Sequence, residues 1–376
     1  MRRHSLEIEP STCPPLRSIN SNHTWTPIVF DGSSSADLDG LSALRLSGQI
    51  REVCDTVEEQ LVELLITRAP GLKENPGGLA EAVVLELGQR EWDQYGCWVY
   101  YPWRQSLVHL LAESDFIELR TNRNRNRITT EEQEALSKKT VGIVGLSVGS
   151  SYALALAMER SCGALRLADF DTLELSNMNR IRTGVHSLGL PKGVIAAREI
   201  AEIDPFFQVE LHLEGLKKEA SDLFFQGLDV VCDACDDVGV KALIRWKARE
   251  LGLPVIMETS DRGMLDVERY DQPEHMPSGF LHGRISEEMM SEMLEASAWN
   301  ADYLDLFVDI GQASSRGVQS LQEVGVSLVG WPQLYSDVAA GGAFATQATR
   351  KILLGESMPD ARLYLALDEQ FSESFD

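Results

Sequence analysis

The stretch TVGIVGLSVGSS, residues 140–151, begins as an apolar strand and continues through a glycine turn into a helix. Gly145 ends the β-prone run, and Gly149 stands where the helix begins. Glycines at such a turn let the backbone approach a phosphate at the helix N-terminus, where free N–H groups and the helix dipole favour an anion. Ser147 stands where the Gly-x-Gly-x-x-Gly pattern has its middle glycine. The stretch therefore predicts a phosphate-binding turn, or a tight strand-to-helix connection that binds no ligand.

Apolar strands and helices alternate after this turn. Further strands are expected at 164–169, 208–213, 228–234, 254–259 and 265–271, with helices at 150–161, 192–203, 221–225 and 238–251. Buried strands separated by helices of this length form β-α-β units in a parallel sheet. We therefore expect an α/β fold: a Rossmann-like, mostly parallel sheet with flanking helices, plus a small N-terminal α+β domain and a helical C-terminal segment.

The rest of the chain divides by composition. Residues 1–40 are rich in Ser, Pro, Asn and Asp, which predicts an extended arm. Helical spacing and the aromatic run WVYYPW, residues 98–103, predict a small α+β domain over residues 41–120, a candidate for recognition of a substrate or leader segment. Residues 121–360 hold the nucleotide-binding domain, and residues 361–376 form an acidic tail.

Two local patterns describe the expected N-terminal domain. Apolar residues between Leu41 and Leu64 fall near a 3.6-residue period, and a second helix is expected from Gly78 to Arg90. Pro102 lacks a backbone N–H, so it places the aromatic run at a sheet edge or a strand end. Aromatic rings also suit base stacking, but the acidic composition favours the interpretation that this run packs against the main domain.

The charge balance limits the partners. The 376 residues include 34 basic and 58 acidic side chains, a net charge of -24, which repels phosphate backbones and makes nucleic acid an unlikely partner. No run approaches the ~18 apolar residues of a membrane span, so no membrane partner is expected. The start, MRRHSLEIEPSTCPP, has no apolar segment typical of a secretory signal, and we expect a cytoplasmic protein with free thiols.

Charged residues near the expected strand ends point to nucleotide chemistry. Asp169 lies 20 residues after Gly149, where a carboxylate accepts hydrogen bonds from ribose hydroxyls of NAD or ATP alike. Arg180 and Lys192 favour ATP, because nucleotidyl transfer needs positive charge where the phosphates accumulate negative charge and hydride transfer does not. Asp236, at the carboxyl edge of the sheet, suits Mg²⁺.

Taken in order, five segments resemble one family. QEALSKKTVGIVG (133–145), DFDTLELSNMNR (169–180), GLPK (189–192), DACDD (233–237) and RKILLGE (350–356) are similar to motifs of the ThiF/MoeB/HesA superfamily, which shares its adenylation domain with the ubiquitin-activating enzymes. The resemblance covers about residues 120–356. It implies a ThiF-like adenylation domain over residues 121–360.

The resemblance also implies roles for individual residues. By this resemblance, an arginine, a lysine and a magnesium-binding aspartate are the catalytic residues. The glycine turn, the D-F-D segment and the asparagine of S-N-x-x-R bind the cofactor. Carried over position by position, the catalytic residues are Arg180, Lys192 and Asp236 (with Mg²⁺ on Asp236), and the cofactor-binding residues are Gly145, Gly149, Asp169, Asp171 and Asn177.

Members of the family are usually dimers in which an arginine upstream of the first strand reaches the partner's ATP site. TNRNRNRIT offers Arg123, Arg125 and Arg127; the spacing does not select one, and Arg125 is taken as the candidate. A basic loop that balances neighbouring acids is the alternative. A homodimer is expected, because the small residues from Gly341 to Ala345 permit close helix approach and have no other obvious partner in the sequence.

The implied activity is that of an ATP-dependent adenylyltransferase. A substrate carboxylate attacks the α-phosphate of ATP, Mg²⁺-pyrophosphate leaves, and an acyl-adenylate forms. The carboxylate belongs to a peptide, a small protein or a small molecule, and similarity to relatives in peptide-antibiotic pathways favours a peptide. Direct transfer or dehydration and cyclisation follow, because no cysteine after Cys235 is present to form an enzyme thioester.

Two other functions and a structural zinc site fit the sequence less well. An NAD(P)-binding oxidoreductase leaves Asn177, Arg180 and Lys192 without a role, and a catalytically inactive nucleotide-binding scaffold rests on the altered glycine turn alone. A structural zinc site of the kind found in relatives needs two Cys-x-x-Cys pairs. Cys232 and Cys235 form a single pair, so no structural zinc is expected.

Overall fold

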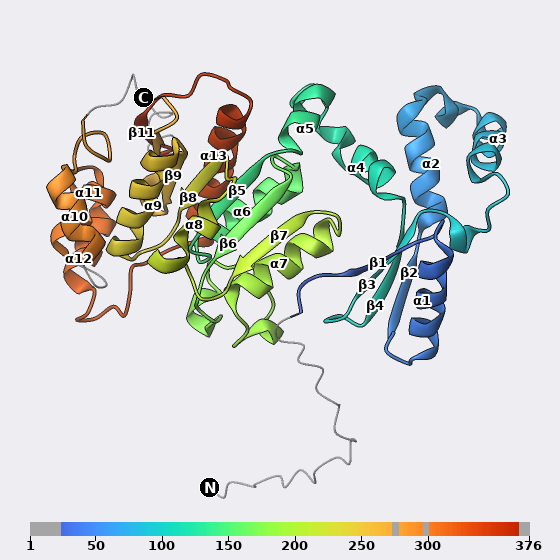
Figure 1. The fold of residues 1–376 in the computed structure, drawn as a ribbon, viewed down its shortest axis with the longest axis horizontal. Coiled ribbons are helices and arrows are strands. Elements are labelled where there is room, and N and C mark those ends of the chain that lie inside the picture. The colour runs from blue at the N-terminus through green and yellow to red at the C-terminus, as the bar shows by residue number, and fades with distance from the viewer. Residues whose placement is uncertain (1–23, 273–277, 296–300, 368–376) are drawn as a thin grey trace, which may run out of the picture.

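Two β-sheets and their helices make up the part of the chain that the computed structural model describes, residues 24–272, 278–295 and 301–367. Figure 1 shows the smaller, N-terminal sheet in blue and cyan at one end of the molecule and the larger sheet in green and yellow at the centre, with the red helix α13 against it. The orange helices α10, α11 and α12 lie at the other end. This is the α/β architecture that the sequence predicts.

The larger sheet has seven strands in the order β11-β10-β9-β8-β5-β6-β7. Five of them are parallel to one another: β5 (Thr140–Val144), β6 (Ala164–Ala168), β7 (Gln208–His212), β8 (Val230–Asp233) and β9 (Pro254–Thr259). Apolar side chains fill both faces of these strands, as expected when helices cover both faces of a parallel sheet. The mostly parallel sheet is therefore confirmed.

The last two strands run antiparallel to their neighbours, and one of them was not among the strands expected from the sequence. The short segment η8 (Asp261–Gly263) joins β9 to β10 (Met264–Arg269), which is too short for a parallel crossover, so β10 runs antiparallel to β9. Residues 361–364 form β11 (Ala361–Tyr364) beside β10, so the prediction of an acidic tail is wrong for them. Residues 368–376 lie outside the described part of the chain.

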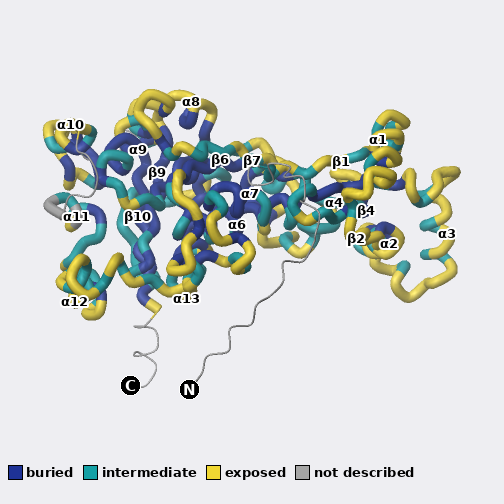
Figure 2. The backbone as a smooth tube through the Cα atoms, turned by 90° about the horizontal axis from the view of Figure 1, so that it is seen from below, coloured by how far each residue is buried: buried dark blue, intermediate teal, exposed yellow. Residues whose placement is uncertain are grey.

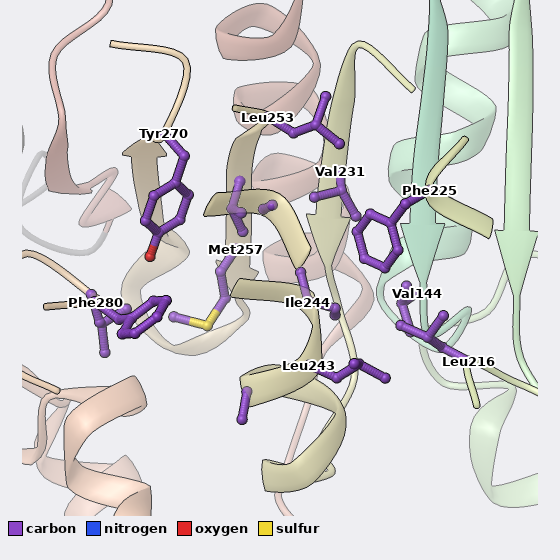
Figure 3. Close-up of a cluster of buried hydrophobic side chains, with 14 of the residues drawn as sticks. Val144, Leu216, Phe225, Val231, Leu243, Ile244, Leu253, Met257, Tyr270 and Phe280 are labelled. Carbon is purple, nitrogen blue, oxygen red and sulfur yellow. The ribbon is translucent and has the colours of Figure 1, made fainter. Parts of the chain in front are cut away.

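Helices cover both faces of this sheet. One face carries α6 (Gly149–Glu159), α7 (Lys192–Ile203) and α13 (Tyr335–Leu353), and the other carries α8 (Ser221–Phe225) and α9 (Val238–Leu251), with α10 (Glu287–Glu295) packed on α9. Figure 3 shows the second face, where Val231 and Met257 of the sheet meet Ile244 of α9. The remaining C-terminal helices are α11 (Ala301–Val308), α12 (Ser315–Glu323) and the short η10 (Ile310–Gln312).

The N-terminal module contains a four-stranded sheet in the order β1-β3-β4-β2. Its elements are β1 (Ile28–Asp31), α1 (Ser35–Leu46), β2 (Glu52–Asp55), α2 (Val57–Arg68), η2 (Pro70–Glu74), α3 (Pro76–Leu87), η3 (Trp92–Gln94), β3 (Cys97–Tyr101), β4 (Ser106–Leu110), α4 (Glu113–Thr121) and η4 (Asn122–Asn124). A single helix, α5 (Thr130–Leu136), leads from it to β5. Figure 2 shows that burial is concentrated in the larger sheet, whereas α3 is exposed or half-buried along its length.

Two expectations for this module are wrong. The strand β1 and the start of α1 lie in the predicted arm of residues 1–40, of which residues 1–23 are outside the described part. The helical spacing after Leu41 is interrupted by β2, since a turn after α1 lets four residues pair with β4. The aromatic strand β3 pairs with strands on both sides, so it is not an edge strand, and Pro102 directly follows its end, which is the other position expected for it.

The module is fixed to the main domain at the C-terminal end of α7. The hydroxyl of Tyr101 donates to the carbonyl of Ala201 at 3.2 Å, and the indole N–H of Trp103 donates to Glu202 at 2.6 Å. Arg120 forms an ion pair of 2.9 Å with Asp204, which is fully buried. The module therefore contacts the helix whose first residue is the candidate Lys192. Within the described ranges, no helix is long and apolar enough to cross a membrane.

Candidate nucleotide-binding site

The turn after β5 requires its glycines. Gly145 has a φ of +90°, and a Cβ there would lie 2.4 Å from the carbonyl oxygen of Ala234, which follows β8. A Cβ on Gly149 would lie 2.9 Å from Ile143 and 3.1 Å from the Cβ of Ala234. The turn therefore lies directly against the end of β8. No side chain caps the N-terminus of α6, so its first N–H groups face the turn without a side-chain acceptor among the described residues.

Asp169, at the end of β6, holds this turn. Its Oδ2 accepts the N–H of Leu146 at 2.6 Å, and its Oδ1 accepts the N–H of Asp171 at 2.7 Å. Burial raises the pKa of Asp169 above its ordinary value, against the opposing effect of these two hydrogen bonds. Each oxygen keeps a second lone pair, so the carboxylate can still accept a hydrogen bond from a ribose hydroxyl.

Lys192 reaches the same place from the first residue of α7. Its Nζ forms an ion pair with Oδ2 of Asp171 at 2.7 Å; the lysine side chain is 8% exposed and the aspartate side chain 52%. One connected set of contacts thus runs from Lys192 through Asp171 and Asp169 to Leu146 in the glycine turn.

Arg180 approaches the turn from the segment after β6. Its Nε donates to the hydroxyl of Ser147 at 3.0 Å, and its Nη1 donates to the carbonyl of Ser176 and to Asn179. Burial lowers the pKa of Arg180, which still leaves a guanidinium charged at neutral pH. Ser147, which departs from the glycine pattern, is therefore the contact between this cation and the turn.

Asn177 shapes the loop that carries Arg180. It lies at the end of η5 (Leu175–Asn177), is buried, and its Oδ1 accepts the N–H of Glu174 at 3.0 Å. Its carbonyl accepts the N–H of Arg180 at 3.1 Å. In this structure Asn177 supports the loop, and its contact with phosphates stays a prediction. Along the chain, η6 (Val185–Ser187) follows this loop, and η7 (Lys218–Ala220) lies between β7 and α8.

Asp236 follows β8 two residues after Ala234, which touches the glycine turn, and is exposed. The next residue, Asp237, has a different task, since its carboxylate accepts the N–H of Val240 and caps α9. In the ranges that the structure describes, no three His, Cys, Asp or Glu side chains gather as a metal cluster. A single carboxylate fits Mg²⁺ that arrives on nucleotide phosphates, because Mg²⁺ often uses one protein carboxylate together with phosphates and water.

Arg125 lies away from these residues. The side chain of Asn124, its neighbour, donates to the carbonyl of Glu159 at 2.9 Å, at the C-terminal end of α6. The glycine turn lies at the other end of this 11-residue helix, roughly 16 Å away along its axis. Arg123, Arg125 and Arg127 are all exposed there. The structure therefore does not bring Arg125 to the site of its own chain, and any role needs a second copy.

The small residues of α13 have a partner within the chain. A Cβ on Gly342 would lie 3.0 Å from the hydroxyl of Ser151 on α6, and a Cβ on Gly341 would lie 2.0 Å from the carboxyl of Glu258 on β9. Ala345 is also fully buried. The face that suggested a homodimer is covered by α6 and β9, so it no longer supports that prediction.

A buried ionic cluster beneath the end of β8 was missed by the sequence analysis. Asp233 is fully buried and forms ion pairs with Lys241 at 3.0 Å and Arg245 at 2.7 Å, and Arg245 also contacts Glu268 at 2.8 Å. Although burial alone would raise it, the two cations lower the pKa of Asp233 to about 2. Cys235 donates its thiol to Asp233 as well. The four-residue spacing of Lys241 and Arg245 on one helix was the available signal.

Sequence comparisons find relatives for the part of the chain that carries this candidate site. The sequence pattern of the ThiF family matches residues 121–275. An uncharacterized protein of Mycobacterium tuberculosis, MT1398, is 44% identical over 267 residues, which are 71% of this chain and 37% of that protein. The tRNA threonylcarbamoyladenosine dehydratase of Bacillus subtilis is 27% identical over 40% of this chain and 59% of its own length. The sulfur carrier protein adenylyltransferase of Thermus thermophilus is 25% identical over 35% of this chain and 48% of its own length.

Solved structures are less similar in sequence. The tRNA N6-threonylcarbamoyladenosine dehydratase of E. coli matches 65% of this chain and 98% of its own, at 21% identity and a TM-score of 0.46. The chain spans less than two thirds of each of the three curated relatives described above. The match to the ThiF family covers the domain at residues 121–275, which holds the glycine turn, Asp169, Arg180, Lys192 and Asp236.

Proposed function

We propose that the domain after residue 121 is an ATP-dependent adenylyltransferase that converts a substrate carboxylate into an acyl-adenylate and releases pyrophosphate. The observation that carries this proposal is the connected set of contacts around the glycine turn. Two cations, Lys192 and Arg180, are attached through Asp171 and Ser147 to one strand-to-helix turn. Hydride transfer to a nicotinamide needs no such pair, whereas the charge of a triphosphate does.

The position of each residue in the site determines its proposed role. Asp169 accepts the ribose hydroxyls at the end of β6, and the N-terminus of α6 receives the phosphates at the end of β5. Lys192 and Arg180 balance the charge that builds on the phosphates as pyrophosphate leaves. Asp236 holds Mg²⁺, which supplies further positive charge to the phosphates when it is bound. The attacking carboxylate is already ionised at neutral pH, so the reaction needs no general base.

Named relatives support the class of reaction, since one of them is a sulfur carrier protein adenylyltransferase. The substrate of this chain is proposed to be a peptide or small protein that ends in a carboxylate, which the N-terminal module helps to recognise. The net charge of -24 speaks against tRNA, on which the B. subtilis relative acts by its name. A homodimer that brings Arg125 to the partner's site stays part of this proposal.

Isotope transfer tests the proposed chemistry. Candidate peptides encoded beside the gene are labelled with ¹⁸O in their carboxyl groups and incubated with the protein, ATP and Mg²⁺. Attack on the α-phosphate followed by loss of the acyl group leaves one ¹⁸O in AMP, which mass spectrometry detects. Label that appears in inorganic phosphate, with ADP as the other product, would show acyl-phosphate chemistry and refute the proposal.

A further inference from the structure

Glu258 has a buried carboxyl group that has no role in the proposed chemistry. It lies near the end of β9 and is 6% exposed. Its Oε1 is buried and has no hydrogen-bond partner among the described residues. The side chain fits only because Gly341 of α13 has no Cβ. A buried polar atom without a partner is rare in proteins and calls for a ligand or another explanation.

The register of the sheet places this carboxyl level with the glycine turn. Val144 pairs with Asp233, and Asp233 pairs with Met257, so the residues that follow, Gly145, Ala234 and Glu258, stand side by side at the carboxyl edge. Two strand spacings put Glu258 about 10 Å from Gly145. The helix contacts agree, since Gly342, next to Gly341, lies against the first turn of α6.

The same register assigns a direction to the ligand. Asp169, the ribose residue of the proposed function, ends β6, on the far side of the glycine turn from β9. The acyl group of an adenylate extends from the α-phosphate away from the ribose, which is toward β8 and β9. Met257 points to the α9 face (Figure 3), so the next residue, Glu258, points to the α6 and α13 face, where the phosphates are expected.

The groups around Glu258 keep its carboxyl neutral. Burial, and then Asp337 in the first turn of α13, raise the pKa of Glu258 to about 8. On the same face, burial raises the pKa of Cys232 on β8 and of Tyr152 on α6, so both are neutral. A neutral carboxylic acid can donate its O–H, and it does not repel an incoming substrate carboxylate.

We propose that Glu258 is a substrate-binding residue of this domain, whose carboxyl O–H donates a hydrogen bond to a carbonyl of the acyl group bound next to the α-phosphate. This rests on the proposed function. It assigns the acyl side of the site to the end of β9, beside the first turn of α6 and the part of α13 around Gly341. It also explains the glycine at position 341, since any larger residue would displace the carboxyl group.

Two stable analogues test the proposal without knowledge of the natural substrate. The first, 5′-O-sulfamoyladenosine, lacks an acyl group, and the second, 5′-O-[N-(acetylglycyl)sulfamoyl]adenosine, carries one with two carbonyl acceptors. Calorimetry measures both affinities at pH 7 and pH 9.5, and their ratio is the acyl increment. We expect a roughly tenfold increment at pH 7 that is lost at pH 9.5, because one hydrogen bond is lost when Glu258 ionises.

Three variants separate binding from structure. Glu258→Gln keeps a neutral donor of the same size, so its increment persists at pH 9.5, whereas Glu258→Met has no increment at either pH. Asp337→Asn removes a neighbouring negative charge, so its increment disappears at a lower pH than in the wild type. An increment in Glu258→Met equal to that of the wild type, or no increment in the wild type at pH 7, would overturn the proposal. Failure of the acyl-free analogue and of ATP to bind the wild type would instead refute the proposed function.

Discussion

The ammonium of Lys192 lies 2.7 Å from the carboxylate of Asp171, and the lysine side chain is buried while that of the aspartate is half exposed. This ion pair can be replaced by a contact between Lys192 and a phosphate, because water can then hydrate the accessible carboxylate of Asp171. The pair also orients the side chain of Lys192 in the absence of a nucleotide. We therefore expect Lys192 to contribute directly to ATP binding.

Replacement of Lys192 by methionine should weaken ATP binding by about tenfold to a hundredfold, the usual effect of one hydrogen bond to a charged group. Methionine fills a similar volume, so urea denaturation should show a folded protein. Calorimetry with ATP and Mg²⁺ provides the affinity. Wild-type affinity in a folded Lys192→Met variant would remove this residue from the site.

Asp236 and Asp237 offer a matched pair for the metal prediction. Asp236→Asn should raise the Mg²⁺ concentration needed for half-maximal ATP binding at least severalfold, since the carboxylate that would hold the ion is lost. Asp237→Asn makes the same change in charge one residue later, and asparagine still caps α9, so its Mg²⁺ dependence should match the wild type. Equal Mg²⁺ dependence in all three proteins would show that Asp236 does not bind the ion.

An alanine at Gly145 of the glycine turn should destabilise the protein more than an alanine at Gly189, which lies outside the turn and serves as the control. Gly189 has a φ of +81° with no atom within 4 Å of an added Cβ, so Gly189→Ala should cost only about 1–2 kcal/mol of backbone strain. Gly145→Ala adds a clash with the backbone of Ala234, and its loss in the free energy of unfolding should be larger by at least about 1 kcal/mol. Urea denaturation measures both. Equal losses would show that the turn has room to relax.

His282 predicts a pH dependence of stability. Although burial alone would lower it, hydrogen bonds to Asp266 and Asp360 raise the pKa of His282 from 6.5 to about 10. The native state thus holds a proton that the unfolded state has lost, so this stabilisation is complete below pH 6.5 and is lost as pH rises through about 10. The difference in unfolding free energy between the wild type and His282→Gln should shrink from pH 6 to pH 10.5. A constant difference would contradict a protonated His282.

The parallel core could be predicted from sequence because each of its strands is a buried apolar run followed by a helix. The strands β1 and β11 could not, since each has four residues and neither is fully buried. They form because β1 can pair with the free edge of β3, and β11 with the free edge of β10. The local sequence around residues 28–31 and 361–364 does not indicate these partner strands. The antiparallel direction of β10 follows from the short connection after β9, because a parallel crossover needs a dozen or more residues.

Some residues of the candidate site could likewise be predicted from the sequence, and others could not. Asp169, Arg180 and Lys192 occur in short motifs, so their types and spacing were enough to place them together. The ionic cluster around Asp233 and the buried Glu258 depend on partners far along the chain, such as Glu268 and Gly341. Charged residues are usually exposed, so composition alone argued against the burial of these groups.

Calorimetric titration of the wild type and Arg180→Ala with ATP and with NAD, in the presence of Mg²⁺, shows whether this site is built for a triphosphate. The wild type should bind ATP more tightly than NAD. Arg180→Ala should lose about tenfold or more in ATP affinity, because the guanidinium held by Ser147 no longer faces the phosphates. Tighter binding of NAD than of ATP by the wild type, or unchanged ATP affinity in a folded Arg180→Ala variant, would contradict a triphosphate site.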